Sequence, residues 1–146
     1  MTENANDSIA RAGVVVDATP EQVWRALTDP AIVKEYFFGT TVTSDWQVGS
    51  PITYSGEWEG TAYEDKGEVL EVDEPRRLVT SFFSPSSGKA DVPENYQKVT
   101  YLVEAVEGGT RVSVEQDNNA DADAAAHSSA NWQMILDGLA GVVGRA

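Results

Sequence analysis

Histidine is a common general base, and this sequence has a single histidine, His127. A serine triad or a histidine-dependent proton transfer would have to use it. His127 falls in a segment with helical periodicity whose apolar stripe includes Trp132. At about 100° per residue, the two side chains lie roughly 140° apart around the helix. We therefore expect His127 on the surface, and the sequence predicts no histidine catalysis.

The segment DNNADAD, from Asp117 to Asp123, begins like a calcium-binding loop of the type D-x-N-x-D. The resemblance ends at the sixth position, where Ala122 replaces the glycine that the turn requires. It fails again at the twelfth position, where Ser128 replaces a bidentate glutamate. We interpret the segment as a polar turn with acids at the start of a helix, and we predict no metal site.

Other catalytic chemistry has little support in this sequence. The absence of cysteine excludes disulfides, thiolate zinc sites and cysteine nucleophiles. Gly56 and Gly60 are more plausible as turn glycines than as part of a phosphate-binding loop. Tyr63 and Glu68 are the only weak candidates for an acid or base in a cyclase-like or hydratase-like enzyme. We expect no catalytic residue and no cofactor, and the sequence leaves open whether a reaction is catalysed.

The charge of the chain limits its partners. Its 146 residues include 24 acids and 10 bases, which gives a formal net charge of −14. Nucleic-acid binding requires a basic face, and no basic cluster is present. No run of about 18 apolar residues exists, so we predict no membrane insertion. The acidic amino terminus does not resemble a signal peptide, which favours a cytoplasmic location.

Two helix-start signals lie close together near the amino end. Thr19 and Gln22 have the spacing of a capping box, and Pro20 follows Thr19 at the first helical position. Asp29 and Pro30 repeat the signal about ten residues later. A β-branched segment, IARAGVVVDA, precedes them and predicts a strand. The pattern therefore predicts a strand followed by two short helices joined at a sharp angle.

The remainder of the chain predicts a sheet and one long helix. About six segments between Thr40 and Asp117 have the alternation or β-branched content of strands, separated by turn residues. A helix is predicted over Ala122–Val143, with a stripe that is bulky in its second half and small in its first. Small residues facing a sheet either allow close approach or leave a void. A void beneath this helix would make a binding cavity.

Several segments carry a resemblance to a known family. These are VVVDATPEQVWRALTDPAIVKEYF, GEVLEVDEPRRLVTSF, VTYLVEAVEGGTRVSVEQ and NWQMILDGL. Together they resemble the START-like, polyketide-cyclase-like (SRPBCC) superfamily, and within it the bacterial homologues of the heat-shock-chaperone ATPase activators. One departure is Tyr36-Phe37-Phe38, where the family usually has a tryptophan near the end of the second helix.

The resemblance implies a single α+β domain over residues 9–146, and the polar composition of residues 1–8 predicts a flexible tail before it. Its fold would be the helix-grip fold, a curved antiparallel sheet of about six to seven strands with two short helices and one long carboxyl-terminal helix over it. The implied function is the binding of a small hydrophobic molecule, such as a lipid or polyketide, between the sheet and the last helix. The alternative is a co-chaperone-type interaction module whose partner is a chaperone.

Strand alternation and the helical stripe give candidate ligand contacts. Tyr101, Gln116 and Ser128 would supply the few polar contacts that orient an apolar ligand. Trp132 lies where the stripe changes from small to bulky residues. The complete set of predicted ligand-binding residues is Phe82, Tyr101, Val103, Val112, Val114, Gln116, Ser128, Trp132 and Leu136.

Overall fold

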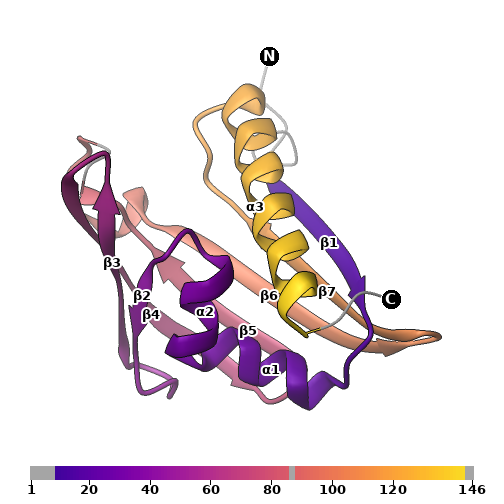
Figure 1. Ribbon diagram of the computed structural model, residues 1–146. Coiled ribbons are helices and arrows are strands. Elements are labelled where there is room, and N and C mark those ends of the chain that lie inside the picture. The colour runs from indigo at the N-terminus through magenta and orange to yellow at the C-terminus, as the bar shows by residue number, and fades with distance from the viewer. Residues whose placement is uncertain (1–8, 86–87, 144–146) are drawn as a thin grey trace.

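Seven antiparallel strands form one continuous curved sheet in the computed structural model, which describes residues 9–85 and 88–143 (Figure 1). The predicted tail at residues 1–8 lies outside the described residues. The strands lie in the order β1-β7-β6-β5-β4-β3-β2. Their bounds are β1 Ala10–Val16, β2 Thr41–Thr43, β3 Pro51–Trp58, β4 Thr61–Asp73, β5 Arg77–Phe82, β6 Gln97–Val106 and β7 Gly109–Gln116.

Two short helices, α1 (Pro20–Thr28) and α2 (Pro30–Tyr36), follow β1 as the sequence predicts. The backbone N–H of Gln22 donates to Thr19 Oγ1 at 3.1 Å, and the Thr19 N–H donates to Gln22 Oε1 at 2.8 Å. Asp29 ends α1 and accepts from the N–H of Ala31 as the cap of α2. The capping box and the second cap are confirmed, and they fix the angle between the two helices.

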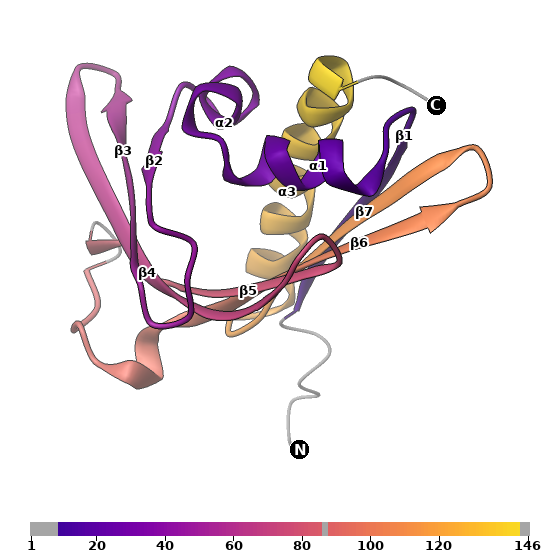
Figure 2. The ribbon, with the colours of Figure 1, turned by 90° about the horizontal axis from the view of Figure 1, so that it is seen from below.

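The long helix α3 spans Ala122–Val143, the range predicted from the sequence. Figure 2 shows the sheet curling around the three helices, with α3 near β1, β6 and β7 and with β2 and β3 on the far side. The α+β helix-grip fold is therefore confirmed. Among the described residues, no helix is long and apolar enough to cross a membrane.

Side chains of α3 attach this helix to the edge strand β1. The N–H of Arg11 donates to Ser129 Oγ at 2.9 Å, and Gln133 Nε2 donates to the carbonyl oxygen of Gly13 at 3.0 Å. An edge strand leaves backbone groups without a neighbouring strand, so these contacts satisfy groups that water would otherwise occupy. They hold α3 at one side of the sheet.

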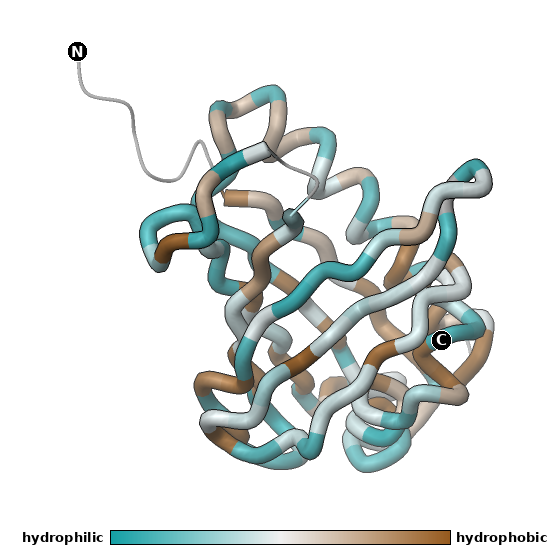
Figure 3. Tube along the Cα trace, turned by 90° about the vertical axis from the view of Figure 1, so that its left-hand side faces the viewer, coloured by the Kyte–Doolittle hydropathy of each residue, from teal (hydrophilic) through white to brown (hydrophobic). Residues whose placement is uncertain are grey.

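The core fills the space between the sheet and the helices. Its largest fully buried side chains are Ile52, Leu78, Leu136 and Leu139, together with six valines. Figure 3 shows hydrophilic segments at the turns and an alternation of hydrophobic and polar segments along the strands. This alternation is expected for a sheet that is covered on one face only.

Strand β4 bends strongly, and the bend depends on a glycine. The pairing of β4 with β5 shifts register between Val69 and Glu71, which is the sign of a β-bulge. Just before it, a Cβ atom on Gly67 would lie 1.9 Å from the carbonyl oxygen of Ser81. Only glycine allows the two strands to approach so closely, and the bend carries the β2–β3–β4 part of the sheet away from α3.

Substitution Gly67→Ala tests this close approach. We expect it to lower the free energy of unfolding by about 2–3 kcal/mol, because the new methyl group must push two backbones apart. Gly141→Ala, inside α3, is the control, because a Cβ atom added there would meet nothing within 4 Å. It should raise the free energy by about 0.5–1 kcal/mol. Urea titrations would measure both, and equal effects would contradict this role of Gly67.

Candidate functional site

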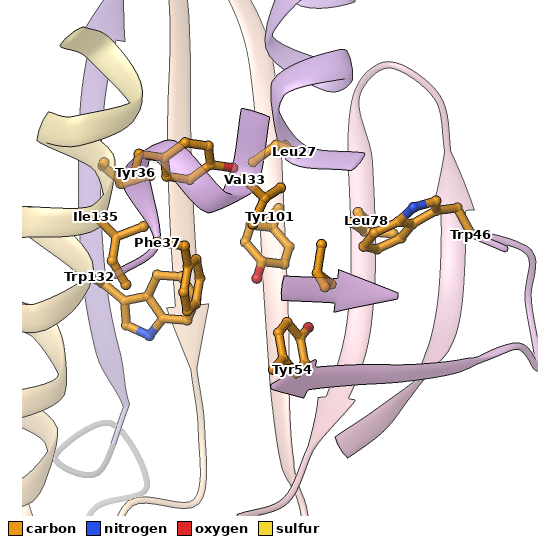
Figure 4. A pocket seen from close by; sticks show the side chains of 12 residues that line it. Leu27, Val33, Tyr36, Phe37, Trp46, Tyr54, Leu78, Tyr101, Trp132 and Ile135 are labelled. Atoms are coloured by element: carbon orange, nitrogen blue, oxygen red, sulfur yellow. The ribbon is translucent and has the colours of Figure 1, made fainter. Parts of the chain in front are cut away.

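A partly enclosed cavity lies between the sheet and helices α2 and α3 (Figure 4). We call it the inner cavity. Its volume is about 20 Å³, which is enough for about one water molecule. Its walls are almost entirely apolar or aromatic. They comprise Leu27, Val33, Tyr36, Phe37, Val42, Trp46, Tyr54, Leu78, Tyr101, Trp132, Ile135 and Leu136.

A larger, open groove lies next to the inner cavity. It has a volume of about 780 Å³ and runs between α3 and the β3–β4 hairpin, with the end of α2 at one side. Phe37 and Tyr54 belong to the walls of both spaces. The residues that line this groove are Phe37, Phe38, Thr40, Tyr54, Glu57, Glu59, Thr61, Ala62, Tyr63, Asp65, Phe82, His127, Asn131 and Met134.

The ring of Phe37 separates the two spaces. It stacks on Tyr54, with ring centroids 6.2 Å apart and an interplanar angle of 22°. On the other side it meets Trp132 edge to face, at 5.8 Å and 82°. Phe37 is only partly buried, so one side of it faces the groove. Phe37 is therefore the partly exposed part of the wall that the groove and the inner cavity share.

A hydrogen-bonded chain of side chains holds Trp132. Its Nε1 donates to Gln116 Oε1 at 2.8 Å, and Gln116 Nε2 donates to Gln97 Oε1 at 2.7 Å. Both ends of the Gln116 amide are therefore occupied by protein groups. Gln116 was predicted to contact a ligand, but in this structure it orients the indole that forms a wall of the inner cavity.

The small residues in the first half of α3 lie close to other segments of the same polypeptide. Ala125 is buried, and Ser128 Oγ donates to Asn119 Oδ1 at 3.2 Å. Ser129 is bonded to β1, as described above. The inner cavity lies instead beneath the bulkier part of the helix, at Trp132, Ile135 and Leu136. The open groove, however, reaches the first half of α3 at His127 and Asn131, so a void beneath the small half stays a prediction.

The other predicted ligand-binding residues divide into three groups. Tyr101, Trp132 and Leu136 line the inner cavity, and Phe82 lines the groove. The structure packs Val103, Val112 and Val114 into the hydrophobic core, and they line neither space. These three valines share the inward face of β6 and β7, but they lie under parts of the helices that leave no gap.

Sequence reasoning missed the residues contributed by α2 and the β2–β3 region. Tyr36 and Phe37 end α2, and Tyr54 reaches the same place from β3. The aromatic run Tyr36-Phe37-Phe38 was the available signal, because it departs from the family's pattern. Its position against Tyr54 and Trp132 depends on contacts distant in sequence, which periodicity does not reveal.

Three tyrosines that line the inner cavity keep their protons well above neutral pH. Burial raises the pKa of Tyr36 and of Tyr101 well above the ordinary value. Burial also raises the pKa of Tyr54 to about 12. The hydroxyl of Thr80 lies near Tyr54 and opposes part of that rise, yet Thr80 Oγ1 is in hydrogen-bond geometry with no described group. All three phenols are therefore neutral at pH 7, and that of Tyr36 donates to the carbonyl oxygen of Ala26.

The rim of the groove is acidic. Glu57, Glu59 and Asp65 line it, and among the described residues no lysine or arginine does so. Burial raises the pKa of the Asp65 carboxyl, with the Ser84 hydroxyl acting in the opposite direction. His127 is exposed on α3 at the groove, in agreement with its predicted surface position. This distribution of charge is unfavourable for an anionic guest.

The structure does not bring the weak acid–base candidates together. The Tyr63 hydroxyl and Thr40 Oγ1 share a hydrogen bond of 2.6 Å in the groove, whereas Glu68 lies in a different surface depression. The calcium-like segment is used as a turn and a cap. The N–H of Lys98 donates to Asp117 Oδ1, and the N–H of Ala124 donates to Asp121 Oδ1.

The comparison with known proteins agrees with this architecture. A family model described as Activator of Hsp90 ATPase homolog 1-like protein matches residues 17–144. The chain belongs to this family. The predicted family membership is thereby confirmed. No curated protein matches the chain.

Solved structures similar to this chain span nearly all of it. ChR145 from Cytophaga hutchinsonii is 50% identical, with a TM-score of 0.78 and 90% of each chain covered. The Aha1 dimer from Colwellia psychrerythraea shares 19% identity at a TM-score of 0.73, covering 93% of this chain and 96% of that one. CalU16 from Micromonospora echinospora shares 24% identity at a TM-score of 0.70, covering 92% and 74%. The last two likenesses show the fold alone.

Substitution Gln116→Leu tests the hydrogen-bonded chain that orients Trp132. It leaves the indole N–H and the Gln97 side chain without their partner. We expect the free energy of unfolding to fall by about 1–3 kcal/mol. The indole N–H resonance of Trp132 should also move in NMR spectra. Gln47→Leu, at an exposed position, should change stability by less than about 0.5 kcal/mol. An unchanged indole resonance in Gln116→Leu would contradict the assignment.

The buried tyrosines predict a loss of stability in alkali. In the unfolded chain a tyrosine ionises near 10.0, whereas the folded protein keeps Tyr54 protonated to about 12. The folded state therefore holds its protons more tightly. The contribution of Tyr54 to the free energy of unfolding is complete below pH 10. It decreases as the pH rises from 10 toward 12. Urea titrations between about pH 9 and 11.5 should show the decline, and Tyr54→Phe should make it shallower. A flat profile would refute the prediction.

Proposed function

We propose that this protein binds a small, mostly apolar molecule in the groove, with the leading end of the molecule entering the inner cavity when Phe37 moves aside. The observation that carries this proposal is the wall shared at Phe37 and Tyr54, in which the partly exposed Phe37 ring lies between an open groove and a partly enclosed aromatic space. The inner cavity alone is too small for an organic ligand. The groove alone is open to water on one side.

The size and composition of the groove support this proposal. Ligand sites in proteins commonly have volumes of about 300–1,000 Å³, and this groove has about 780 Å³. Seven apolar or aromatic side chains line it, and burial of apolar area contributes roughly 25 cal/mol per Å² to affinity. These side chains are Phe37, Phe38, Tyr54, Ala62, Tyr63, Phe82 and Met134. Two of them, Phe38 and Met134, are 57% and 56% exposed, so a guest would cover hydrophobic surface.

The second candidate function is a co-chaperone-type interaction without a ligand. Family membership favours it, because the family is described by an activator of the Hsp90 ATPase. In this case the exposed Phe38 and Met134 would contact a protein surface instead of a small molecule. The two functions differ in whether occupancy of the inner cavity is required.

A tryptophan substitution that fills the groove distinguishes experimentally between these two functions. Asn131 is exposed on α3 and lines the groove, whereas the neighbouring Ala130 is exposed on α3 and does not. The probe is N-phenyl-1-naphthylamine, a neutral apolar fluorophore. We expect wild type and Ala130→Trp to bind it alike and Asn131→Trp to bind at least about tenfold more weakly, equivalent to about 1.4 kcal/mol. In the wild type, binding should shift the indole N–H resonance of Trp132.

Equal binding by the two tryptophan variants would place the probe elsewhere and contradict the proposal. Absence of binding to the wild type, together with stimulation of a chaperone ATPase that Asn131→Trp abolishes, would favour the second candidate. Circular dichroism and urea titration would establish that both variants are folded. Because both substituted positions are exposed, little loss of stability is expected.

A further inference from the structure

The Tyr101 hydroxyl faces the inner cavity and has no hydrogen-bond partner in the part of the chain that the structure describes. In Figure 4 its oxygen points into the cluster of side chains, on the side of Tyr54. Tyr36, in the same wall, differs: its hydroxyl donates to the carbonyl oxygen of Ala26 at 2.7 Å. Of the two hydroxyls, only that of Tyr101 is therefore available to a guest.

Tyr101 is partly buried, and its side chain lines the space of the inner cavity. Among the described residues, the fully buried side-chain hydroxyl without a partner is that of Thr80, so the Tyr101 hydroxyl is instead a polar group at the cavity surface. Tyr101 is surrounded by the rings of Trp132 and by aliphatic side chains of the cavity, including Leu78 and Leu136. A phenylalanine here would keep the packing without burying a polar atom. The hydroxyl therefore gives the wall of the inner cavity a polar group to which a guest can bond.

The aromatic slot next to Tyr101 indicates the shape of the guest. The Phe37 ring lies between Tyr54 and Trp132, and the other neighbour of Trp132 is Tyr101, at 5.8 Å and 83° between the ring planes. A flat ring that replaced Phe37 would gain the same two aromatic contacts. Its leading edge would then point toward the Tyr101 hydroxyl.

We propose that Tyr101 anchors the ligand by donating a hydrogen bond to a carbonyl or hydroxyl oxygen at the leading end of a flat, uncharged, apolar molecule. This inference rests on the proposed function and specifies its ligand class. An ionised leading group is disfavoured because, among the described residues, no lysine, arginine or histidine lines the inner cavity. Burial of an unpaired charge there would be far more costly than burial of a neutral oxygen.

The acidic residues at the rim of the groove also disfavour a negatively charged guest at the entrance. Glu57, Glu59 and Asp65 repel anions, and the formal net charge of −14 adds to this effect. Fatty-acid anions are therefore poor guests, whereas neutral ketones and phenols meet no repulsion. The rim of the groove and the inner cavity therefore both disfavour a negatively charged guest.

Two probes of nearly equal shape test the anchor. 2-Acetylnaphthalene carries a ketone oxygen, and 2-ethylnaphthalene replaces the acetyl group by an ethyl group. Their affinities are measured by displacement of N-phenyl-1-naphthylamine from wild type, Tyr101→Phe and Tyr96→Phe. Tyr96→Phe is the matched control, because its hydroxyl donates to Asp91 outside both spaces.

We expect Tyr101→Phe to weaken the ketone about tenfold and the hydrocarbon less than about twofold, as the loss of one buried hydrogen bond predicts. Tyr96→Phe should leave both affinities unchanged. In the wild-type complex the infrared carbonyl stretch of the bound ketone should lie at lower frequency than in hexane, and Tyr101→Phe should remove this shift.

Equal losses for the two probes in Tyr101→Phe, or an unshifted carbonyl stretch in the wild type, would overturn the anchoring role while leaving the groove as a binding site. Failure of the wild type to bind N-phenyl-1-naphthylamine at all would instead refute the proposed function. Stronger binding of decanoate than of decanol would also overturn the inference, because it would show that the site accepts an anion.

Discussion

The attachment of α3 to the edge strand β1 is the constraint from which the architecture of the site follows. Ser129 and Gln133 bond to the free backbone groups of β1, so the helix is held at one border of the sheet. The sheet then bends at Gly67 and carries β2 and β3 away from the helix. A straight helix cannot follow both sides of a curved sheet, and the groove is the space that remains.

Aromatic rings occupy the inner end of this space instead of leaving it empty. Phe37, Tyr54, Trp132 and Tyr101 form a continuous series of ring contacts with centroid distances of 5.8–6.2 Å. Such rings fill volume, which accounts for an inner cavity of only about 20 Å³. They are also able to turn about two side-chain bonds, and one of them, Phe37, is reached from the groove. In the proposed binding mode a ring of the guest takes the place of the Phe37 ring, so a large permanent void is not required.

Electrostatics adds selectivity that the aromatic rings lack. Stacking and edge contacts accept many flat molecules, since their energies depend mainly on area and geometry. In the proposed function, the carboxylates at the rim and the neutral phenols inside discriminate between guests by charge and by hydrogen bonding. The acidic residues at the rim would then contribute to ligand selection as well as to solubility.

Local signals in the sequence predicted the elements closely. The caps at Thr19 and Asp29 and the range of α3 follow from interactions between residues a few positions apart, and each is confirmed. Alternation in β6 and β7 identified the buried face for the same reason. The site was predicted only in part: Tyr101, Trp132, Leu136 and Phe82 line it, whereas Gln116 bonds to protein groups and the three valines are core.

What the sequence by itself determined is which residues face inward and where each helix and strand begins, because these depend on periodicity and on contacts within one turn of chain. Only the tertiary structure decided where the inward face remains unfilled. That outcome depends on the bend at Gly67, on the bonds of α3 to β1 and on the meeting of Phe37 with Tyr54 and Trp132. A gap remains where surfaces from distant parts of the chain do not fit together completely. Local sequence patterns do not predict how such surfaces fit.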